Sequence, residues 1–182
     1  MKKIPTIFER DWNGDRSRVT QEPHPGCEWV FAGEGVVTRK YDGSACLYED
    51  GQLWKRHEVR QGKTTPENFR QVEDDLGTGK TVGWVPVGDG PEDKWHRDAL
   101  ARTTSELNPG TYELIGPKVQ GNPEKVAQHE LVPHAQAPQY EVTRTYAGLL
   151  GALSRLDIEG FVFHHPDGRM AKIKKRDFGM KR

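Results

Sequence analysis

The short stretch Lys40-Tyr41-Asp42-Gly43 holds the side chain with the strongest claim to covalent chemistry. We interpret Lys40 as a nucleophile that takes a nucleotide onto its amine. A lysine amine attacks only when it is neutral, and with a reference pKa of about 10.4 roughly one lysine in a few thousand is neutral at pH 7. The rest of the site must therefore lower that pKa through nearby cations, a metal ion or burial.

Two acidic side chains that suit a nucleotide site occur later in the chain. Glu159 opens the stretch Glu159-Gly-Phe-Val-Phe. Its carboxylate can ligate Mg²⁺, a cation that favours oxygen ligands and phosphate substrates, or it can hold Lys40 in place. Glu113 lies in the stretch Tyr112-Glu-Leu-Ile-Gly and can accept hydrogen bonds from ribose hydroxyls.

Basic side chains for the phosphates follow on other predicted strands. Arg56 faces away from Lys55 on the strand after Lys40, and an arginine can bind a phosphate through two parallel hydrogen bonds. Lys172 and Lys174 add two ammonium groups. They begin a tail in which six of the last eleven residues are Lys or Arg and one is Asp. That tail is either a nucleic-acid contact or a solvated chain end, and the sequence favours neither.

The last two predicted strands, 158–165 and 170–175, are expected to form a hairpin around Pro166-Asp167-Gly168. A three-residue loop gives the pairs His165–Arg169, Phe163–Ala171, Val162–Lys172 and Phe161–Ile173. Because side chains alternate across a sheet, one face then carries Phe161, Phe163 and Ile173, and the other carries Val162, Lys172 and Lys174. We expect the base over Val162 and the phosphates against the lysines. A two-residue loop would shift the pairing and scramble these faces.

The remaining pattern predicts many strands and two helices. Residues 1–26 are expected to be an irregular lead-in and 62–83 a long loop. Further strands are predicted over 28–39, 44–48, 52–59, 111–115 and 128–132, and 83–88 is expected to be an edge strand because Pro86 cannot donate to a ladder. Helices are predicted over 92–107 and 145–156. The result is an α+β fold with largely antiparallel sheets, in one domain spanning residues 1–182.

Composition bounds the class of protein. The chain has 182 residues, with 27 Lys+Arg against 27 Asp+Glu, so a general polyanion coat is excluded while a local basic groove is not. The two cysteines form no framework and are expected to be free thiols in a reducing compartment. The N-terminus lacks the apolar region of a signal peptide, and no stretch approaches the ~20 apolar residues of a membrane span. We expect a monomeric cytoplasmic protein.

With these residues in hand, the chain resembles the covalent lysine-nucleotidyltransferases, that is, ATP-dependent ligases and mRNA capping enzymes, and among them the small RNA ligases. The resemblance rests on five segments in order: Lys40–Gly43, Arg56, Tyr112–Gly116, Glu159–Phe163 and Lys172–Lys174. It implies an ATP-grasp-like ligase adenylation domain, ATP and Mg²⁺ (or Mn²⁺) as cofactors, and RNA ends with a 5′-phosphate and a 3′-hydroxyl as partners. It also implies contacts to the nucleotide from Lys40, Asp42, Gly43, Arg56, Glu113, Val162, Lys172 and Lys174, with Glu159 at the metal.

Two departures from the family pattern bear on the function. The chain ends eight residues after Lys174, so we expect no OB-fold domain, which weakens the capping and DNA-ligase alternatives. The family usually has a residue after the third of these segments that stacks on adenine. Here the sequence does not decide among His129, Leu131 and Val132 for this role. The alternatives to RNA ligation are DNA-nick sealing, GTP-dependent capping, and a non-catalytic module that binds nucleotide or RNA.

Two motifs that look functional do not meet their requirements. Gly77-Thr-Gly-Lys-Thr81 resembles a phosphate-binding loop, but the required first glycine is Asp74 and Val82 to Val87 breaks the helix that should follow. His129 and His134 are five residues apart rather than four, with Pro133 between them, so a zinc helix is not expected.

Overall fold

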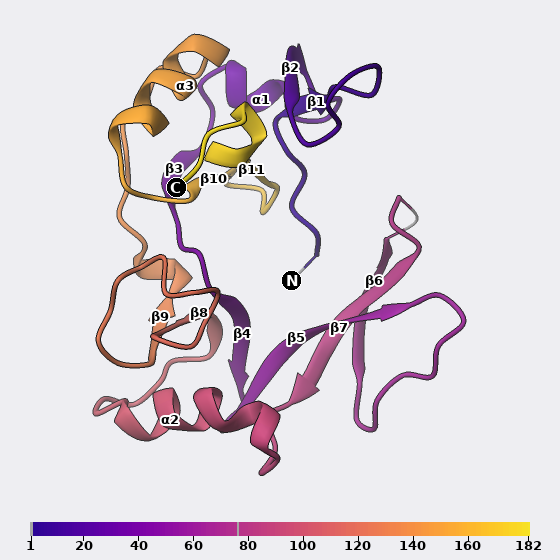
Figure 1. The fold of residues 1–182 in the computed structure, drawn as a ribbon, viewed down its shortest axis with the longest axis vertical. Coiled ribbons are helices and arrows are strands. Elements are labelled where there is room, and N and C mark those ends of the chain that lie inside the picture. The colour runs from indigo at the N-terminus through magenta and orange to yellow at the C-terminus, as the bar shows by residue number, and fades with distance from the viewer. Residues whose placement is uncertain (1, 76) are drawn as a thin grey trace. The chain divides into compact units, whose positions relative to one another are not determined.

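A computed structural model describes residues 2–75 and 77–182. It is a mixed α+β structure whose sheets are mostly antiparallel and whose helices are few, as the sequence predicts (Figure 1). The chain divides into two compact units: unit 1 is mainly Asp42–Gln136, and unit 2 is Ile4–Tyr41 together with Ala137–Arg182. That the two units act as one adenylation domain stays a prediction.

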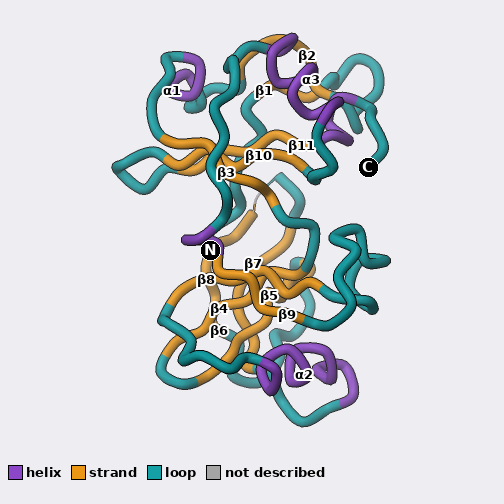
Figure 2. The backbone as a smooth tube through the Cα atoms, turned by 90° about the vertical axis from the view of Figure 1, so that its left-hand side faces the viewer, coloured by secondary structure: helices purple, strands orange, loops and turns teal. Residues whose placement is uncertain are grey.

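Unit 2 is built on a three-stranded sheet in the order β11-β10-β3. Its strands are β3 (Val36–Lys40), β10 (Gly160–His164) and β11 (Met170–Lys174), which lie side by side in Figure 2. The predicted hairpin register is confirmed, because Val162 pairs with Lys172 and Phe161 with Ile173. The predicted core face is also confirmed, since the side chains of Phe161, Phe163 and Ile173 are fully buried.

Helices and a second hairpin complete the core of unit 2. The helix α3 (Tyr146–Arg155) buries Leu149 and Leu153 against the sheet, and Thr145 begins it by accepting a hydrogen bond from the Gly148 N–H. The prediction of a helix over 145–156 is therefore confirmed. The other elements of this unit are β1 (Phe8–Arg10), β2 (Val19–Pro23), the short helix α1 (Glu28–Phe31) and the 3₁₀ turn η3 (Lys175–Phe178).

Unit 1 contains a six-stranded sheet in the order β6-β7-β5-β4-β8-β9. Its strands are β4 (Ser44–Glu49), β5 (Gln52–Arg60), β6 (Arg70–Asp75), β7 (Lys80–Pro86), β8 (Gly110–Ile115) and β9 (Glu130–Pro133). The helix α2 (Lys94–Arg102) follows the 3₁₀ turn η1 (Pro91–Asp93) and buries Ala99 in a core with Cys46 and Leu114. A further 3₁₀ turn, η2 (His134–Gln136), follows β9.

Two predictions for the N-terminal third are wrong. Residues 28–39 do not form one strand, because Glu28–Phe31 is a helical turn that buries the adjacent residues Trp29 and Val30 in the same core. Gly33 and Gly35, both with positive φ, then separate this turn from β3. The lead-in over 1–26 is not irregular throughout, since β1 and β2 pair there and bury Phe8 and Val19.

Two predictions for the middle of the chain are also wrong. The expected loop over 62–83 contains β6 and most of β7, and β6 was hidden because an edge strand can carry polar side chains along its length. The strand with Pro86 is not an edge strand, since β7 lies between β6 and β5. Pro86 is tolerated there because it is the last residue of β7 and lies beyond Trp84, where the pairing with β6 stops.

Candidate active site

One face of the unit 2 sheet carries three lysines. Lys40 on β3 and Lys174 on β11 are both register partners of Gly160, and Lys172 lies two residues from Lys174. Residues that pair, or that lie two apart on one strand, project from the same side of a sheet, so all three ammonium side chains share one face. We call it the lysine face. It is the face opposite the buried phenylalanines, as the sequence predicts.

Glu159 links two of these lysines. Its Oε2 accepts a hydrogen bond from Lys40 Nζ at 2.5 Å, and its Oε1 lies 3.8 Å from Lys174 Nζ. The backbone of Glu159 is fixed as well, because its carbonyl accepts a hydrogen bond from the Lys175 N–H at 2.9 Å. The Lys40 ammonium also donates to the carbonyl of Tyr41 at 3.2 Å. The predicted pairing of Glu159 with Lys40 is therefore present in unit 2.

Gly160 allows this close arrangement. A Cβ at this position would overlap the carbonyl oxygen of Ile173 and would lie 2.9 Å from the Cα of Lys174. Contacts of that kind force a backbone shift. Glycine at position 160 therefore lets β11 approach β10 closely at the point where Lys40 and Lys174 flank it.

The pKa values of two side chains on the lysine face, Lys172 and Lys174, are lowered. Burial, together with the positive charges of Lys174 and Lys40, lowers the pKa of Lys172 to about 8, against the opposing effect of Asp177 and Glu159. Burial also lowers the pKa of Lys174, with Glu159 opposing the shift. These two amines thus carry a charge that is only partly compensated, which is the condition in which a phosphate binds well.

Val162 is the apolar member of the lysine face. It is the register partner of Lys172 on one side and of Thr38 on the other, and 9% of it is exposed. Thr38 Oγ1 lies 2.9 Å from His164 Nε2, farther along the same face. The apolar patch beside the two ammonium groups, predicted for the base, is therefore narrow and centred on Val162.

A buried ion pair behind the lysine face was not anticipated. Asp177 in η3 is fully buried, and its two oxygens accept hydrogen bonds from the Lys174 N–H and from Arg10, both at 2.8 Å. The backbone of Lys172 also exchanges hydrogen bonds with Pro5 and Ile7. The N-terminal segment thus supports β11. The sequence carries only a weak signal of this, an aspartate in a basic tail.

Unit 1 brings Glu113 to the Gly43 end of the Lys-x-Asp-Gly motif. The Gly43 N–H donates to Glu113 Oε1 at 3.1 Å, and a Cβ on Gly43 would overlap the carbonyl oxygen of Leu114. The Asp42 N–H donates to Glu124 at 2.9 Å. The motif therefore needs glycine at position 43 because β8 passes so close. The chain passes from unit 2 to unit 1 between Tyr41 and Asp42, inside this motif.

Glu113 is a buried acid rather than a solvated residue of an edge strand. It is 7% exposed, and its Oε2 lies 2.9 Å from Nε2 of His134, whose Nδ1 lies 3.0 Å from Thr111 Oγ1. Sequence reasoning considered His134 only as a zinc ligand and missed this role. The signal that could have found it is its place just after β9, the register neighbour of β8.

Arg56 shares a face of the six-stranded sheet with Glu113. Ala45 is the register partner of Glu113, and alternation along β4 and β5 puts Ala45 and Arg56 on one side. Lys55 projects from the other side, where it forms an ion pair with the buried Asp93. The prediction that Arg56 faces away from Lys55 is confirmed. The Lys55 ammonium is already paired with the Asp93 carboxylate.

The three candidates for stacking on adenine differ in their surroundings. His129 is buried, with its ring stacked on Trp95 at a centroid distance of 4.5 Å and its Nδ1 2.7 Å from Asp98. Leu131 packs against the core of unit 1. Val132 is the register partner of Glu113 and so shares its face. Of the three, Val132 is the one beside the predicted ribose contact.

Metal ions in proteins are commonly held by clusters of His, Cys, Asp or Glu side chains. Within residues 2–75 and 77–182, no three His, Cys, Asp or Glu side chains gather in a way that would hold a metal ion. Mg²⁺ in phosphate sites is often held by one or two carboxylates, with substrate oxygens and water completing its shell. Glu159 offers a single carboxylate beside the three lysine amines, which fits a metal ion whose other ligands come from a bound phosphate and water.

The segment 77–81, which resembles a phosphate-binding loop in sequence, has a structural role. Thr78 and Gly79 lie in the turn between β6 and β7, where their N–H groups donate to the Asp75 carbonyl, and a strand rather than a helix follows.

Among the residues that the structure describes, none of the helices has both the length and the apolar character that a membrane crossing demands. A scan of known family models and a search of curated proteins found nothing that matches this chain.

Proposed function

We propose that the protein is an ATP-dependent RNA ligase that joins 5′-phosphate and 3′-hydroxyl RNA ends through an AMP carried on Lys40. The observation that supports this most is the lysine face of unit 2. Three amines converge there with one carboxylate, and Glu159 contacts both Lys40 and Lys174. A structural ion pair needs only one lysine for one acid. Three lysines share Glu159 on this face, and the second nearby acid, Asp177, already accepts hydrogen bonds from Arg10 and from the Lys174 N–H, so the ammonium groups suit a polyanionic substrate.

The proposed first step transfers AMP to the protein. The ammonium of Lys40 first loses a proton to solvent, and the neutral amine then attacks the α-phosphorus of ATP. A nitrogen–phosphorus bond forms, the bond to the bridging oxygen breaks, pyrophosphate leaves, and the nitrogen gives a second proton to solvent. Glu159, which accepts a hydrogen bond from the Lys40 ammonium at 2.5 Å, holds that nitrogen in place before the reaction. Lys172 and Lys174 stabilise the charge that develops on the phosphate oxygens.

The next two steps pass the AMP to RNA and then seal the strand. An oxygen of the RNA 5′-phosphate attacks the phosphorus held on Lys40, the nitrogen–phosphorus bond breaks, and the RNA end becomes adenylylated. The 3′-hydroxyl then attacks the RNA 5′-phosphorus, a phosphodiester forms, and AMP leaves. Mg²⁺, held by Glu159 and the phosphates, would supply charge neutralisation at the transferred phosphate.

Unit 1 carries the groups that the resemblance assigns to the rest of the nucleotide. An ionised carboxylate has about four acceptor sites. Glu113 uses one for the Gly43 N–H and one for His134, so its carboxylate retains capacity for a ribose hydroxyl. Arg56 on the same face of that sheet stays the predicted phosphate contact from unit 1.

The test is transfer of label from α-labelled ATP to the protein in the presence of Mg²⁺. We expect wild-type protein to become labelled, Lys40→Ala to be unlabelled, and Lys172→Ala or Lys174→Ala to lose at least about tenfold in rate, since each removes a charge–phosphate hydrogen bond of about 1.5–3 kcal/mol. Lys118→Ala, which removes an exposed lysine of unit 1, is the matched control and should label normally.

Substrate choice distinguishes the proposal from its alternatives. Purified protein is offered ATP or GTP, and then 5′-phosphorylated RNA or nicked DNA. Labelling with GTP but not with ATP would indicate a capping enzyme. Sealing of nicked DNA but not of RNA would indicate a DNA ligase. Tight binding of ATP or RNA without any label on the protein would indicate a non-catalytic module. Each of these results would contradict RNA ligation.

A further inference from the structure

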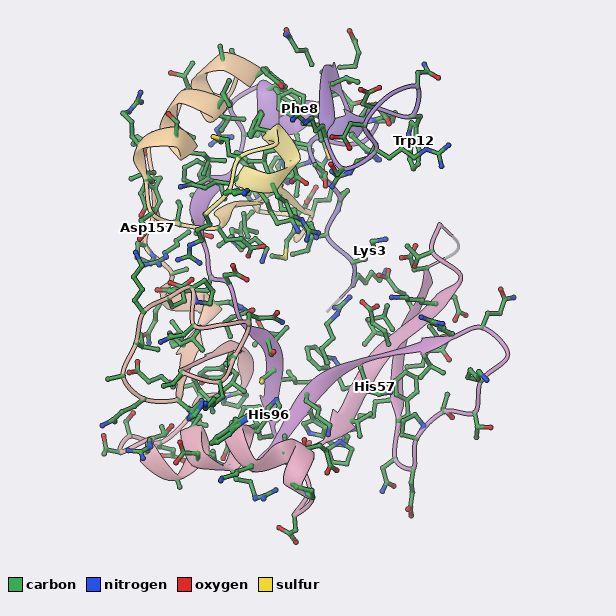
Figure 3. All side chains as sticks on the ribbon, viewed as in Figure 1. Lys3, Phe8, Trp12, His57, His96 and Asp157 are labelled. Atoms are coloured by element: carbon green, nitrogen blue, oxygen red, sulfur yellow. The ribbon has the colours of Figure 1, made fainter. Side chains whose placement is uncertain are left out.

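An exposed tryptophan projects from the loop between β1 and β2 in unit 2. Trp12 is 62% exposed. Among the residues that the structure describes, the exposed large hydrophobic side chains are those of Trp12 and Val36. Figure 3 shows its side chain at the outer edge of this loop. The guanidinium carbon of Arg16 lies 5.9 Å from the centre of the Trp12 ring. An indole beside a guanidinium presents a flat, cationic surface.

The loop Asp11–Arg18 is held in shape by its own hydrogen bonds. Asp15 Oδ1 accepts from both the N–H and the hydroxyl of Ser17, at 2.9 and 2.6 Å, and its Oδ2 lies 3.2 Å from Arg18. The Arg18 carbonyl accepts from the Asp11 N–H at 3.1 Å. The carboxylate of Asp15 is therefore taken up inside the loop. A ligand that meets a pre-shaped loop loses less entropy on binding than one that must order it.

The same loop is connected to the lysine face through unit 2. Arg10, at the start of the loop, donates to Ser17 O at 3.0 Å and to the buried Asp177, which in turn holds the backbone of Lys174. Arg18 lies against Gly179: a Cβ added to Gly179 would be 2.7 Å from the guanidinium carbon of Arg18. The loop thus packs on the C-terminal turn that follows Lys174.

We propose that the loop Asp11–Arg18 is a docking surface for the single-stranded RNA end, with a base stacked on Trp12 and phosphates bound by Arg16 and the exposed Arg176 of η3. This inference rests on the proposed function and extends it from the nucleotide to the polynucleotide. Every base has a flat face, so stacking on one indole tolerates any sequence. A ligase that joins arbitrary ends needs a contact of this kind.

Charge and shape favour a nucleic-acid strand as the occupant. The loop is neutral as a whole, with Asp11 and Asp15 against Arg16 and Arg18, but Arg18 pairs with Asp15. The exposed Arg16, together with the exposed Arg176 of η3, is therefore the local source of attraction for a polyanion in a chain without net charge. A folded protein partner would need a wider apolar surface than one indole. The exposed residues of the loop are otherwise polar, including Asn13, Asp15 and Ser17.

The test measures RNA affinity and Lys40 labelling separately. Fluorescence anisotropy follows a 5′-phosphorylated, 3′-fluorescein 12-nucleotide RNA bound to full-length wild type, Trp12→Ala, Trp12→Phe and Arg16→Ala. Since stacking on one aromatic side chain contributes about 1–3 kcal/mol, Trp12→Ala should weaken binding by about 5- to 150-fold. Trp12→Phe should retain most of the affinity, and Arg16→Ala should lose part of it.

Two controls remove one side chain of the same kind elsewhere in unit 2. Val36→Ala trims the other exposed apolar residue, and Arg155→Ala removes an exposed arginine of α3. Both should bind the RNA as wild type does. Labelling by ATP, a step that needs no RNA, checks that each variant is folded.

The outcomes separate this inference from the proposed function. Equal RNA affinity of Trp12→Ala and wild type, or an equal loss in Val36→Ala and Arg155→Ala, would overturn the docking surface even if Lys40 is labelled normally. Absence of label on wild-type protein would overturn the proposed function instead. A selective loss of RNA affinity in Trp12→Ala, recovered in Trp12→Phe, would support the docking surface.

Discussion

Lys172 is the residue whose protonation is most open to experiment. Burial and two neighbouring cations set its pKa at about 8, so at pH 9 about nine in ten of these side chains are neutral in the free protein. A neutral amine no longer attracts phosphate. If the ammonium of Lys172 binds ATP as proposed, kcat/KM for labelling must lose this contribution above pH 8.

We predict that Lys172→Arg removes this loss. Arginine stays charged throughout the range, so the ratio of kcat/KM for the variant to that for wild type should rise by about tenfold between pH 7 and pH 9. Label transfer across that range at low ATP measures the ratio. A ratio independent of pH would show that the charge of Lys172 does not contribute to ATP binding.

His96 in α2 is a second buried titratable residue, in unit 1. Neither of its ring nitrogens has a hydrogen-bond partner among the described residues, and Asp93 Oδ1 lies 3.8 Å from Nδ1. Burial lowers its pKa from 6.5, helped by Lys55 and opposed by Asp93. The unfolded chain therefore binds a proton at this histidine more readily than the folded chain does.

The sign of the resulting pH dependence follows from proton linkage. The unfolded state takes up more protons, so the free energy of unfolding should fall as pH falls below about 6.5. We predict that His96→Gln, which cannot titrate, loses less stability than wild type between pH 7 and pH 5. Urea unfolding at each pH measures this, and parallel curves for the two proteins would contradict it.

At the scale of elements, the packing of β10 against β11 depends on Gly160. We predict that Gly160→Ala lowers the free energy of unfolding by about 1–3 kcal/mol, the usual cost of forcing extra atoms into a packed site. It should also slow labelling of Lys40, because the flanking lysines move with the strands. Denaturant unfolding and label transfer measure the two effects.

Gly151→Ala is the matched control for this substitution. The same methyl group on α3 would have Arg155 Nη1 at 3.6 Å as its nearest neighbour, an ordinary contact. Alanine in a helix interior stabilises by roughly 0.5–1 kcal/mol relative to glycine. An equal effect of the two substitutions on stability would show that the approach of β11 to position 160 is not tight.

Elements with a regular pattern of apolar residues were predictable, and the others were not. The register of the β10–β11 hairpin was predicted correctly, because Pro166-Asp167-Gly168 favours a three-residue loop and alternation then assigns the faces, although a two-residue loop was the alternative. By contrast, β6 has no apolar alternation, and β1 and β2 have one buried residue each, Phe8 and Val19. Their strand character comes from pairing with the next strand along the chain, β1 with β2 and β6 with β7, which the propensity of each segment alone does not encode.

The candidate site was predictable where its groups belong to regular strands. The common face of Lys172 and Lys174 and the pairing of Glu159 with Lys40 follow from short sequence spacings and family order. The supports were not predictable, since Arg10 reaches Asp177 across most of the chain length and His134 reaches Glu113 from a 3₁₀ turn. Side chains that contact across loops leave no periodic signal.

At the scale of the whole molecule, equal numbers of acidic and basic residues restrict how RNA can bind. With a net charge of zero and a sequence pI of about 7.1, the protein has no general field that attracts RNA. We predict a shallow salt dependence: contacts to about two phosphates, by Arg16 and Arg176, give a slope of log affinity against log salt of about −1.4 for a single strand. Anisotropy titrations at KCl concentrations from about 50 to about 300 mM measure this slope.

A variant sharpens that measurement. Arg16→Ala should reduce the steepness of the slope by about 0.7, the contribution of one phosphate contact. A wild-type slope steeper than about −5 would instead require a broad basic surface, which contradicts a local docking loop.

The fold class was predictable from the whole sequence, while its division into two units was not. Alternating strand patterns with two amphipathic helices suffice for an α+β class. The boundary at Tyr41–Asp42 has no linker composition, because it falls within the motif that carries Lys40. The units are distinguished by their separate sheets and by two separate hydrophobic cores, neither of which local composition indicates.

The two cysteines give the protein a practical property for spectroscopy. Cys27 and Cys46 are both free and buried, and burial raises the pKa of the first to about 11 and of the second to about 12. Thiolates, the species that react with maleimides and iodoacetamides, are therefore scarce at either native position near neutral pH. A single cysteine introduced at an exposed site such as Arg155 should accept a fluorophore or spin label selectively, without prior removal of the natural thiols.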